Sequence, residues 1–121
     1  MEQTMQRMTK TMALGLALLL TISARSAMAQ APDGQAVYKE NCKSCHGING
    51  VPPERERTKY AKLRTLGDSG FVASLSPDSI VKIVTNGIDK NMKSFKDKLS
   101  ADEIRAVAGY IKELAEKRRR G

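Results

Sequence analysis

The chain contains few of the residue types from which small proteins usually build a core or a metal site. Its 121 residues include two cysteines, one histidine and no tryptophan, and aromatic residues make up 4% of the sequence. A structural zinc site needs four ligands, so it would have to draw a carboxylate from elsewhere in the chain. No stretch shows the alternation of polar and apolar residues that is typical of a half-buried strand. The sequence therefore predicts an all-α fold with little apolar mass of its own.

An apolar run near the N-terminus is too short to span a bilayer. It covers the eleven residues 12–22, whereas a membrane-spanning helix needs about twenty. Basic residues precede it and a small-x-small cleavage pattern ending at Ala29 follows it, which is typical of a secretory signal peptide. An uncleaved membrane anchor is the alternative interpretation. We predict a cleaved leader at residues 1–29 and one domain at residues 30–121.

Both cysteines and the histidine stand together in the sequence Cys42-Lys43-Ser44-Cys45-His46. This C-x-x-C-H spacing is the attachment pattern of a c-type haem. Thiols three residues apart lie on one side of a helical turn, so each can add to one vinyl group of a porphyrin, and His46 can then offer a nitrogen to the iron. We predict one covalently attached haem c. A thiol–disulfide redox pair, a structural zinc site and a simple disulfide are the alternatives.

The domain that would remain after cleavage is short of large apolar side chains. A chain of this length buries only about two-thirds of the surface that it exposes when unfolded. Its aromatic residues are Tyr38, Tyr60, Phe71, Phe95 and Tyr110. A large, flat, apolar cofactor would supply the missing core, which agrees with the attachment pattern.

Three helices are predicted from capping residues and periodicity. Asp33 is a good N-cap for a helix over residues 34–41. Ser76, followed by proline, favours a second helix that stops at Gly87. A capping-box pattern at Ser100 opens the last helix. Its apolar face of helical period comprises Ile104, Val107, Ala108, Ile111 and Leu114.

The middle of the chain is less regular. Two prolines and two glycines make residues 47–53 a loop. Residues 54–66 begin with alternating charges and continue with apolar residues at helical spacing, so we predict a short amphipathic helix with a solvated charged face. Gly67 and Gly70 are expected to interrupt helical structure after it.

Residues 30–121 contain a single methionine, Met92. It lies in a polar segment, residues 86–95, between two predicted helices, and we expect this flexible loop to wrap over the far face of the haem. Methionine also serves as core filler, but Asn91 and Lys93 flank this one. We predict Met92 as the second iron ligand opposite His46, and no catalytic residues.

On these residues the chain resembles a bacterial class I c-type cytochrome with one haem and histidine–methionine ligation. The resemblance covers residues 33–115. The matching features are Gly34 and Tyr38, the C-x-x-C-H-G sequence at residues 42–47, Met92 with Phe95 three residues on, and Tyr110 in the last helix. It implies Cys42, Cys45, His46 and Met92 as the haem-binding residues, with His46 and Met92 as the metal ligands.

The resemblance also implies how the fold is arranged and where the protein works. About four short helices should wrap around the haem, and the first and last should cross, with Gly34 and Tyr38 against the face that bears Val107, Tyr110 and Ile111. The family attaches its haem outside the bacterial inner membrane, which implies a periplasmic protein.

Two departures from the family pattern affect the site. The family often has proline after the ligand methionine, where this chain has Lys93. The family also uses a proline carbonyl to accept a hydrogen bond from the ligand histidine, a contact that orients the imidazole. Pro52 and Pro53 are the candidates here, although both follow His46 closely, and the sequence leaves open which carbonyl makes the bond.

The charge balance points to acidic partners. The formal net charge is +8, of which the leader carries two, so residues 30–121 carry +6. A positive surface favours acidic proteins or anionic membranes, and no nucleic-acid-binding motif is present, so we expect no nucleic acid partner.

Basic residues 117–120 are either a solvated tail or a contact with anionic lipid. Five lysines flank the haem-binding segments: Lys43, Lys90, Lys93, Lys96 and Lys98. They either form a docking rim for redox partners or only keep the protein soluble.

With both axial positions of the iron filled, one-electron exchange is the chemistry that is left. The resemblance thus implies a monomeric periplasmic electron carrier that docks to redox partners, and not an enzyme. One alternative is an electron-accepting subunit of a dehydrogenase or oxidoreductase complex. A haem-based gas sensor or weak peroxidase is the other, if Met92 leaves the iron, although a peroxidase would lack a distal acid–base group.

Overall fold

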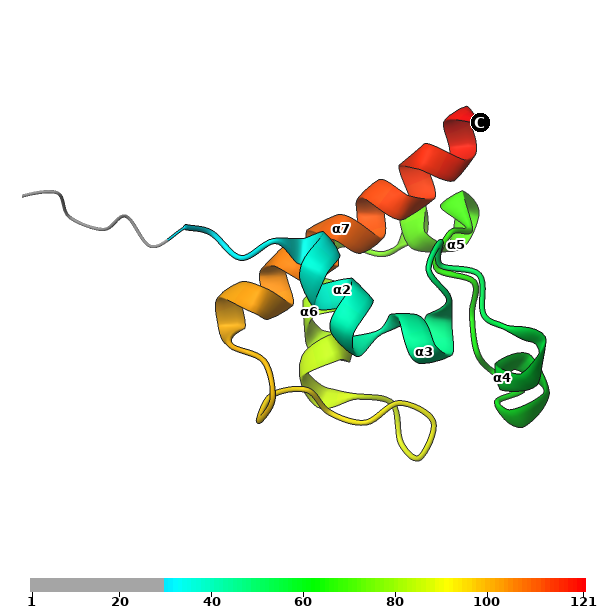
Figure 1. Cartoon of the computed structure of the whole chain (residues 1–121), viewed down its shortest axis with the longest axis horizontal. Helices are drawn as coiled ribbons and strands as arrows, with labels where there is room; N and C mark the ends of the chain where they lie inside the picture. Colours follow the sequence, from blue (N-terminus) through cyan, green and yellow to red (C-terminus); the bar gives the residue numbers. More distant parts are fainter. Residues whose placement is uncertain (1–29) are drawn as a thin grey trace, which may run out of the picture. The chain divides into compact units, whose positions relative to one another are not determined.

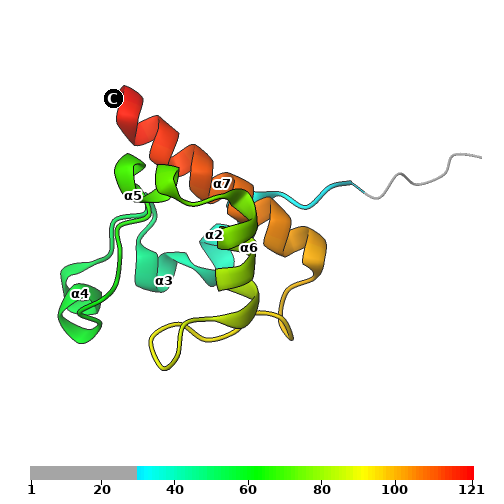
Figure 2. The same cartoon turned by 180° about the vertical axis from the view of Figure 1, so that it is seen from behind.

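The computed structural model describes residues 30–121, in which six helices occur (Figure 1; Figure 2). They are α2 (Gly34–Asn41), α3 (Lys43–His46), α4 (Glu54–Lys59), α5 (Ser69–Ser74), α6 (Pro77–Asn86) and α7 (Ala101–Arg120). The predicted signal peptide lies outside the described residues. Within residues 30–121 there is no strand, apart from an isolated bridge between Ile88 and Met92. The all-α prediction is confirmed, and none of these six helices is long and apolar enough to cross a membrane.

The three helix starts predicted from capping residues are confirmed. The Asp33 carboxylate accepts a hydrogen bond from a backbone N–H of the first turn of α2 at 2.9 Å. Ser76 caps α6 in the same way at 3.1 Å, and α6 ends before Gly87, whose φ is 74°. At α7, Ser100 and Glu103 each accept a bond from the other's backbone N–H, which completes the capping box.

The first and last described helices cross, as the family resemblance implies. The Tyr38 and Tyr110 rings lie 5.3 Å apart with their planes at 57°, and Tyr38 and Val107 are completely buried. Gly34 lies directly against α7, since a Cβ added there would be 2.1 Å from the carbonyl oxygen of Ala106. The close approach therefore depends on the absence of a side chain at Gly34.

The buried core lies between α7 and the shorter helices. Its apolar side chains are Val37, Tyr38, Val72, Ile80, Val84, Phe95, Leu99, Ile104, Val107, Ala108, Tyr110, Ile111, Leu114 and Ala115. Lys112 of α7 adds a polar tie, because its Nζ donates to the carbonyl oxygens of Val72 at 3.1 Å and Leu75 at 2.9 Å. A lysine ammonium is favourable at the carbonyl end of a helix, so α7 supplies a cap for α5.

The predicted helix over residues 54–66 is too long. α4 ends at Lys59, and Tyr60 leaves the helix with φ −123° and ψ 88°. The expectation of a solvated charged face is wrong at one residue, because Glu56 is only 6% exposed and pairs with Arg55 at 2.9 Å. Short helices owe their stability to packing and not to their own periodicity. The apolar residues after Tyr60 are therefore free to follow tertiary contacts in a loop.

The expected number of about four helices omits two short ones. α3 is the single turn that carries the attachment residues. α5 follows Asp68, whose carboxylate accepts bonds from the N–H groups of Gly70 at 2.9 Å and Phe71 at 3.4 Å. Gly70, predicted to interrupt helical structure, thus lies inside α5. The signal that could have found this helix is Asp68, a favoured N-cap residue.

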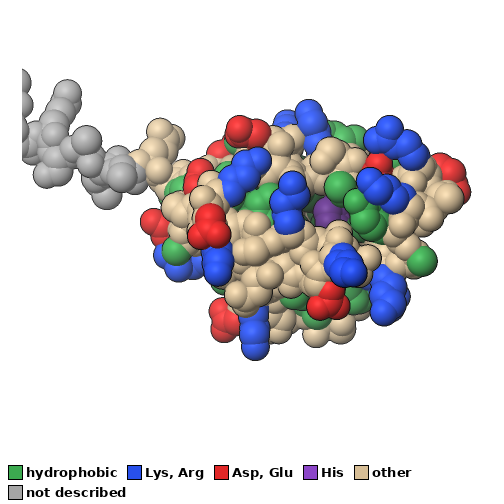
Figure 3. Space-filling model, turned by 90° about the horizontal axis from the view of Figure 1, so that it is seen from below, with side chains coloured by type: hydrophobic (Ala, Val, Ile, Leu, Met, Phe, Trp, Pro, Cys, Tyr) green, Lys and Arg blue, Asp and Glu red, His purple; other side chains and the backbone are tan. Residues whose placement is uncertain are grey.

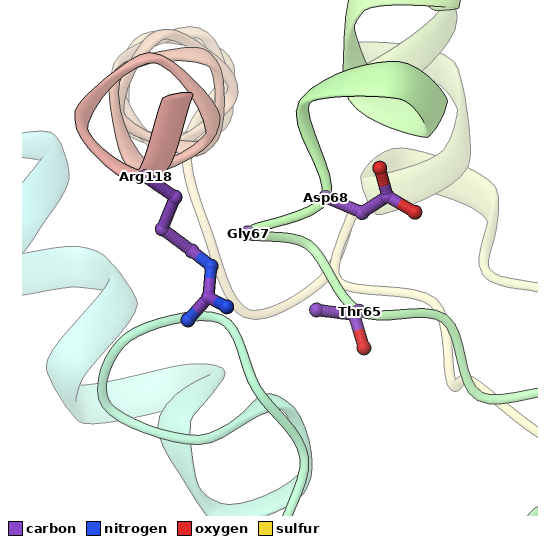
Figure 4. Close-up of a pocket in the computed structure, with 4 residues that line it drawn as sticks. All are labelled: Thr65, Gly67, Asp68 and Arg118. Carbon is purple, nitrogen blue, oxygen red and sulfur yellow. The ribbon is translucent and has the colours of Figure 1, made fainter. Parts of the chain in front are cut away.

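The basic C-terminal residues continue α7 as far as Arg120. Arg118 reaches from α7 over the backbone at Gly67, while Asp68 points away from it (Figure 4). Arg119 pairs with Glu116 at 2.6 Å. These residues are exposed, but Arg119 has an ion-pair partner and the Lys117 Nζ lies 5.9 Å from the centre of the Tyr110 ring.

Candidate functional site

The C-x-x-C-H sequence forms one tight turn directly after α2. The Cys42 N–H still bonds to the carbonyl of Tyr38 at 2.9 Å, and the Cys42 carbonyl accepts from His46 N–H at 3.0 Å. Both thiols are free and half-buried. The structure therefore places Cys42, Cys45 and His46 on a single turn, the arrangement that covalent attachment of one porphyrin requires.

The Cys42 thiol is poorly suited to the alternative of a thiol–disulfide redox pair. Burial, followed by the neighbouring Cys45, raises the pKa of Cys42 to about 11, although the charge of Lys98 opposes the shift. Redox-active C-x-x-C pairs depend on a lowered thiol pKa. The zinc alternative gains no support either, because no group of three or more His, Cys, Asp or Glu residues within residues 30–121 could hold a metal ion.

His46 is held in the form that can bind a metal. Burial lowers the pKa of the imidazole, and the backbone of Arg64 partly opposes this, so the ring is neutral at physiological pH. A neutral imidazole is the form that coordinates a metal. Of the two candidate prolines, Pro53 uses its carbonyl to accept the N–H groups that open α4. Arg64 is the residue whose backbone approaches the imidazole.

Two buried polar atoms near the attachment turn fit a bound group. Among residues 30–121, the buried side-chain atoms without a hydrogen-bond partner are Asn41 Oδ1 and His46 Nδ1. Buried polar atoms are normally hydrogen-bonded, yet both of these flank or belong to the attachment sequence. Figure 3 shows the histidine in a hollow of one face, with apolar and basic side chains around it. The donor set and its surroundings therefore fit a haem.

Met92 lies in a turn more ordered than the flexible loop expected from the sequence. Its backbone exchanges two hydrogen bonds with Ile88, at 2.8 and 3.1 Å. Gly87, at φ 74°, lets the turn close, because a Cβ there would be 2.3 Å from the Met92 carbonyl oxygen. Ser94 Oγ donates to the Thr85 carbonyl at 2.6 Å and fixes the turn to the end of α6. Hydrogen bonds therefore fix the backbone that carries the half-buried Met92 side chain.

Two of the predicted site residues contact the same hydrophobic core. Cys42 and Met92 are both half-buried against the same hydrophobic core cluster, although they are fifty residues apart in sequence. His46 continues the turn that begins at Cys42. The predicted site residues therefore occupy two segments, the attachment turn and the Met92 turn, that border one core.

Sequence comparison links the chain to haem proteins. A family model described as "Cytochrome C oxidase, cbb3-type, subunit III" matches residues 29–111. The "Cytochrome c6-like" protein of Nostoc sp. (strain PCC 7120) is 41% identical over 70% of this chain and 71% of its own length. The chloroplastic cytochrome c6 of Chlamydomonas reinhardtii is 38% identical over 86% of this chain and 68% of its own length.

Structural comparison agrees with this. The solved structure of the "KustC0563 c-type cytochrome" matches with a TM-score of 0.63 and 28% identity, over 69% of this chain and 98% of that one. The likeness covers nearly all of that protein, so the matched part of this chain has the fold of a c-type cytochrome.

Proposed function

Because the chain belongs to the monohaem class I c-type cytochromes, we propose that it is a periplasmic one-electron carrier whose iron is held between His46 and Met92. The chain is an electron-transfer protein with one covalently attached haem c. The observation that carries the proposal is the set of available ligands, since residues 30–121 contain a single histidine and a single methionine. Both stand in segments that border the same core.

The chain's residues prepare the two sides of this site differently. Cys42 and Cys45 would hold the haem through thioether bonds, and the half-buried, neutral His46 would coordinate the iron from the same turn. Met92 would offer its thioether from the second segment, on a turn closed by backbone hydrogen bonds. When bound, the haem supplies an iron that alternates between Fe(II) and Fe(III), at a potential raised by the methionine ligand. The protein's remaining task is to hold both ligands in place.

We also propose that the protein is exported to the periplasm and works there as a monomer. Residues 1–29 have the pattern of a signal peptide, and their removal would leave the domain free to diffuse between partners. Contact with a membrane would then be limited to the basic end of α7. Since Arg119 pairs with Glu116 and Lys117 lies over the Tyr110 ring, we propose acidic proteins, and not lipid, as the main partners.

A visible absorption spectrum of the exported protein tests the closed site. We expect sharp low-spin bands in both oxidation states, a weak far-red sulfur–iron band when oxidised, and no shift on exposure of the reduced protein to carbon monoxide. A prompt shift with carbon monoxide would contradict the proposal. It would mean an open iron position and would favour a haem-based gas sensor or weak peroxidase.

The docking part of the proposal rests on charges around the two site segments. Lys98 is close enough to Cys42 to oppose the rise of its thiol pKa, and Lys43 belongs to the attachment turn itself. The lysine rim is the exposed set Lys43, Lys90, Lys93, Lys96 and Lys98. A positive rim around the site would steer acidic partners toward the haem edge.

Replacing the five rim lysines with glutamine is expected to slow electron transfer to an acidic partner. The rate should fall by about tenfold or more at low ionic strength, and the difference should shrink as salt screens the charges. Stopped-flow kinetics at several salt concentrations measures this. The control removes five exposed cations from α2, α6 and α7: Lys39, Lys82, Arg105, Lys117 and Arg120. Equal losses in both variants would show an effect of net charge alone and would contradict the rim.

One specific observation favours a second candidate, an electron-accepting subunit of a larger complex. Ile48 and Ile88 are 52% and 47% exposed, one just after the attachment turn and the other in the Met92 turn. Exposed apolar side chains beside a site suit a lasting protein contact, and the matching family model is itself named for an oxidase subunit. Co-purification of the haem protein with a stable partner at native abundance would favour the subunit over the carrier.

A further inference from the structure

Tyr38 makes a hydrogen bond that the electron-carrier argument does not use. Its side chain is completely buried, and its hydroxyl donates to the carbonyl oxygen of Gly47 at 2.8 Å. Gly47 directly follows His46 in the sequence. A buried hydroxyl on α2 therefore contacts the carbonyl oxygen of the residue that follows the proposed iron ligand.

Gly47 is fixed from several directions. Its N–H donates to the Lys43 carbonyl at 2.8 Å, and its own carbonyl accepts from Gly50 N–H at 3.3 Å as well as from Tyr38. Its φ of 76° suits glycine alone, and a Cβ there would lie 1.9 Å from the Val51 carbonyl oxygen. The Gly47 backbone is thus held by hydrogen bonds at both its N–H and its carbonyl, and the Tyr38 hydroxyl makes the shorter of the two bonds to that carbonyl.

The imidazole itself has little side-chain support. His46 Nδ1 is buried and has no hydrogen-bond partner in the described part of the chain. The orientation of a metal-binding histidine is normally set by a hydrogen bond to its second nitrogen. Here the backbone of Arg64 approaches the imidazole, and the position of the ring also depends on the backbone that carries His46.

We propose that the Tyr38 hydroxyl is a positioning group for His46, acting through the Gly47 carbonyl. The inference rests on the proposed role of His46 as an iron ligand. Burial, followed by the proximity of Cys42 and Tyr110, raises the pKa of Tyr38 far above its ordinary value, so the hydroxyl stays protonated and available as a donor. Removing it leaves the Gly47 carbonyl with the longer bond from Gly50 alone.

The neighbouring Tyr110 provides a matched control. Its ring packs against Tyr38, and it is also buried. Its hydroxyl, however, accepts from Gln35 Nε2 at 3.2 Å and has no hydrogen bond to the attachment turn. Tyr38→Phe and Tyr110→Phe therefore remove the same atom from the same aromatic pair, and only the first change touches the segment of His46.

The test compares both variants with the wild type as full-length, exported holoproteins. Electron paramagnetic resonance of the oxidised protein reports the ligand field of the iron through its g-values, and voltammetry gives the reduction potential. Hydrogen exchange at the Gly50 amide reports the turn. We expect Tyr38→Phe to shift the g-values and the potential, and to speed Gly50 exchange about five- to tenfold, as for the loss of one hydrogen bond. Tyr110→Phe should leave all three near wild type.

Two results would overturn the positioning role while leaving the proposed function intact. One is equal g-values and potentials in the two variants; the other is faster Gly50 exchange in Tyr38→Phe with unchanged g-values, which would mark the bond as structural only. A wild-type protein without a low-spin histidine-ligated signal would overturn the proposed function as well. If Tyr38→Phe fails to mature, site-specific 3-fluorotyrosine at position 38 keeps the hydroxyl as a stronger donor, and unchanged g-values there would contradict the proposal.

Discussion

Replacing Met92 with alanine is expected to open the iron to carbon monoxide and to lower the reduction potential. The thioether is the only methionine sulfur in residues 30–121, so no second methionine can take its place. Loss of the methionine ligand removes the group that raises the potential. Carbon monoxide binding should rise from undetectable in the wild type to nearly complete at saturating gas, and the far-red sulfur–iron band should disappear.

The effect should stay local, because the turn that carries Met92 is closed by its backbone. The two bonds between Ile88 and Met92 involve main-chain atoms only, and Gly87 keeps its conformation when the side chain at position 92 is shortened. Lys93→Ala is the matched control, since it shortens an exposed side chain in the same turn. It should retain the closed spectrum. A Met92→Ala protein with the wild-type spectrum and no carbon monoxide binding would remove Met92 from the site.

The parts of the fold that the sequence predicted well are those governed by local chemistry. Asp33, Ser76 and Ser100 cap helices through bonds to backbone groups two or three residues away, and such bonds leave a pattern within a few residues. The attachment turn is equally local, because the spacing of Cys42, Cys45 and His46 fits only one turn of helix. Local sequence patterns were therefore enough to predict the starts of these three helices and the three residues of the attachment turn.

The features that the sequence did not reveal depend on distant contacts. The Lys112 ammonium caps α5 from forty residues away, and the Tyr38 hydroxyl reaches Gly47 only because α2 and the attachment turn fold back on each other. The end of α4 is a similar case. The apolar spacing after Tyr60 fits a helix, but Gly67 N–H bonds to the Gly50 carbonyl at 3.2 Å and holds the segment as a loop. Periodicity carries no information about such contacts.

Gly34→Ala is expected to have the largest effect on stability, because the new side chain would collide with backbone atoms of α7, which cannot move aside as a side chain can. The new Cβ would lie 2.1 Å from the Ala106 carbonyl oxygen, 2.6 Å from its carbon and 3.2 Å from Tyr110 Cβ. No rotamer change can relieve the first two contacts, so α2 must move away from α7. Overpacking of this kind costs about 1–3 kcal/mol in free energy of unfolding. In a domain of this size each kcal/mol lowers Tm by about 4–8 °C.

Gly109→Ala is the control, since it makes the same substitution in α7, the other of the two crossing helices. Gly109 is exposed in α7, and an added Cβ would meet nothing within 4 Å. Replacing glycine with alanine inside an exposed helix should raise the free energy of unfolding by about 0.8–1 kcal/mol. Chemical denaturation of both holoproteins, followed by far-UV circular dichroism, measures the two changes. Opposite signs are the expected result. If Gly34→Ala were as stable as the wild type, the two helices could not cross as closely as described, and the contact between Tyr38 and Tyr110 would have to be looser too.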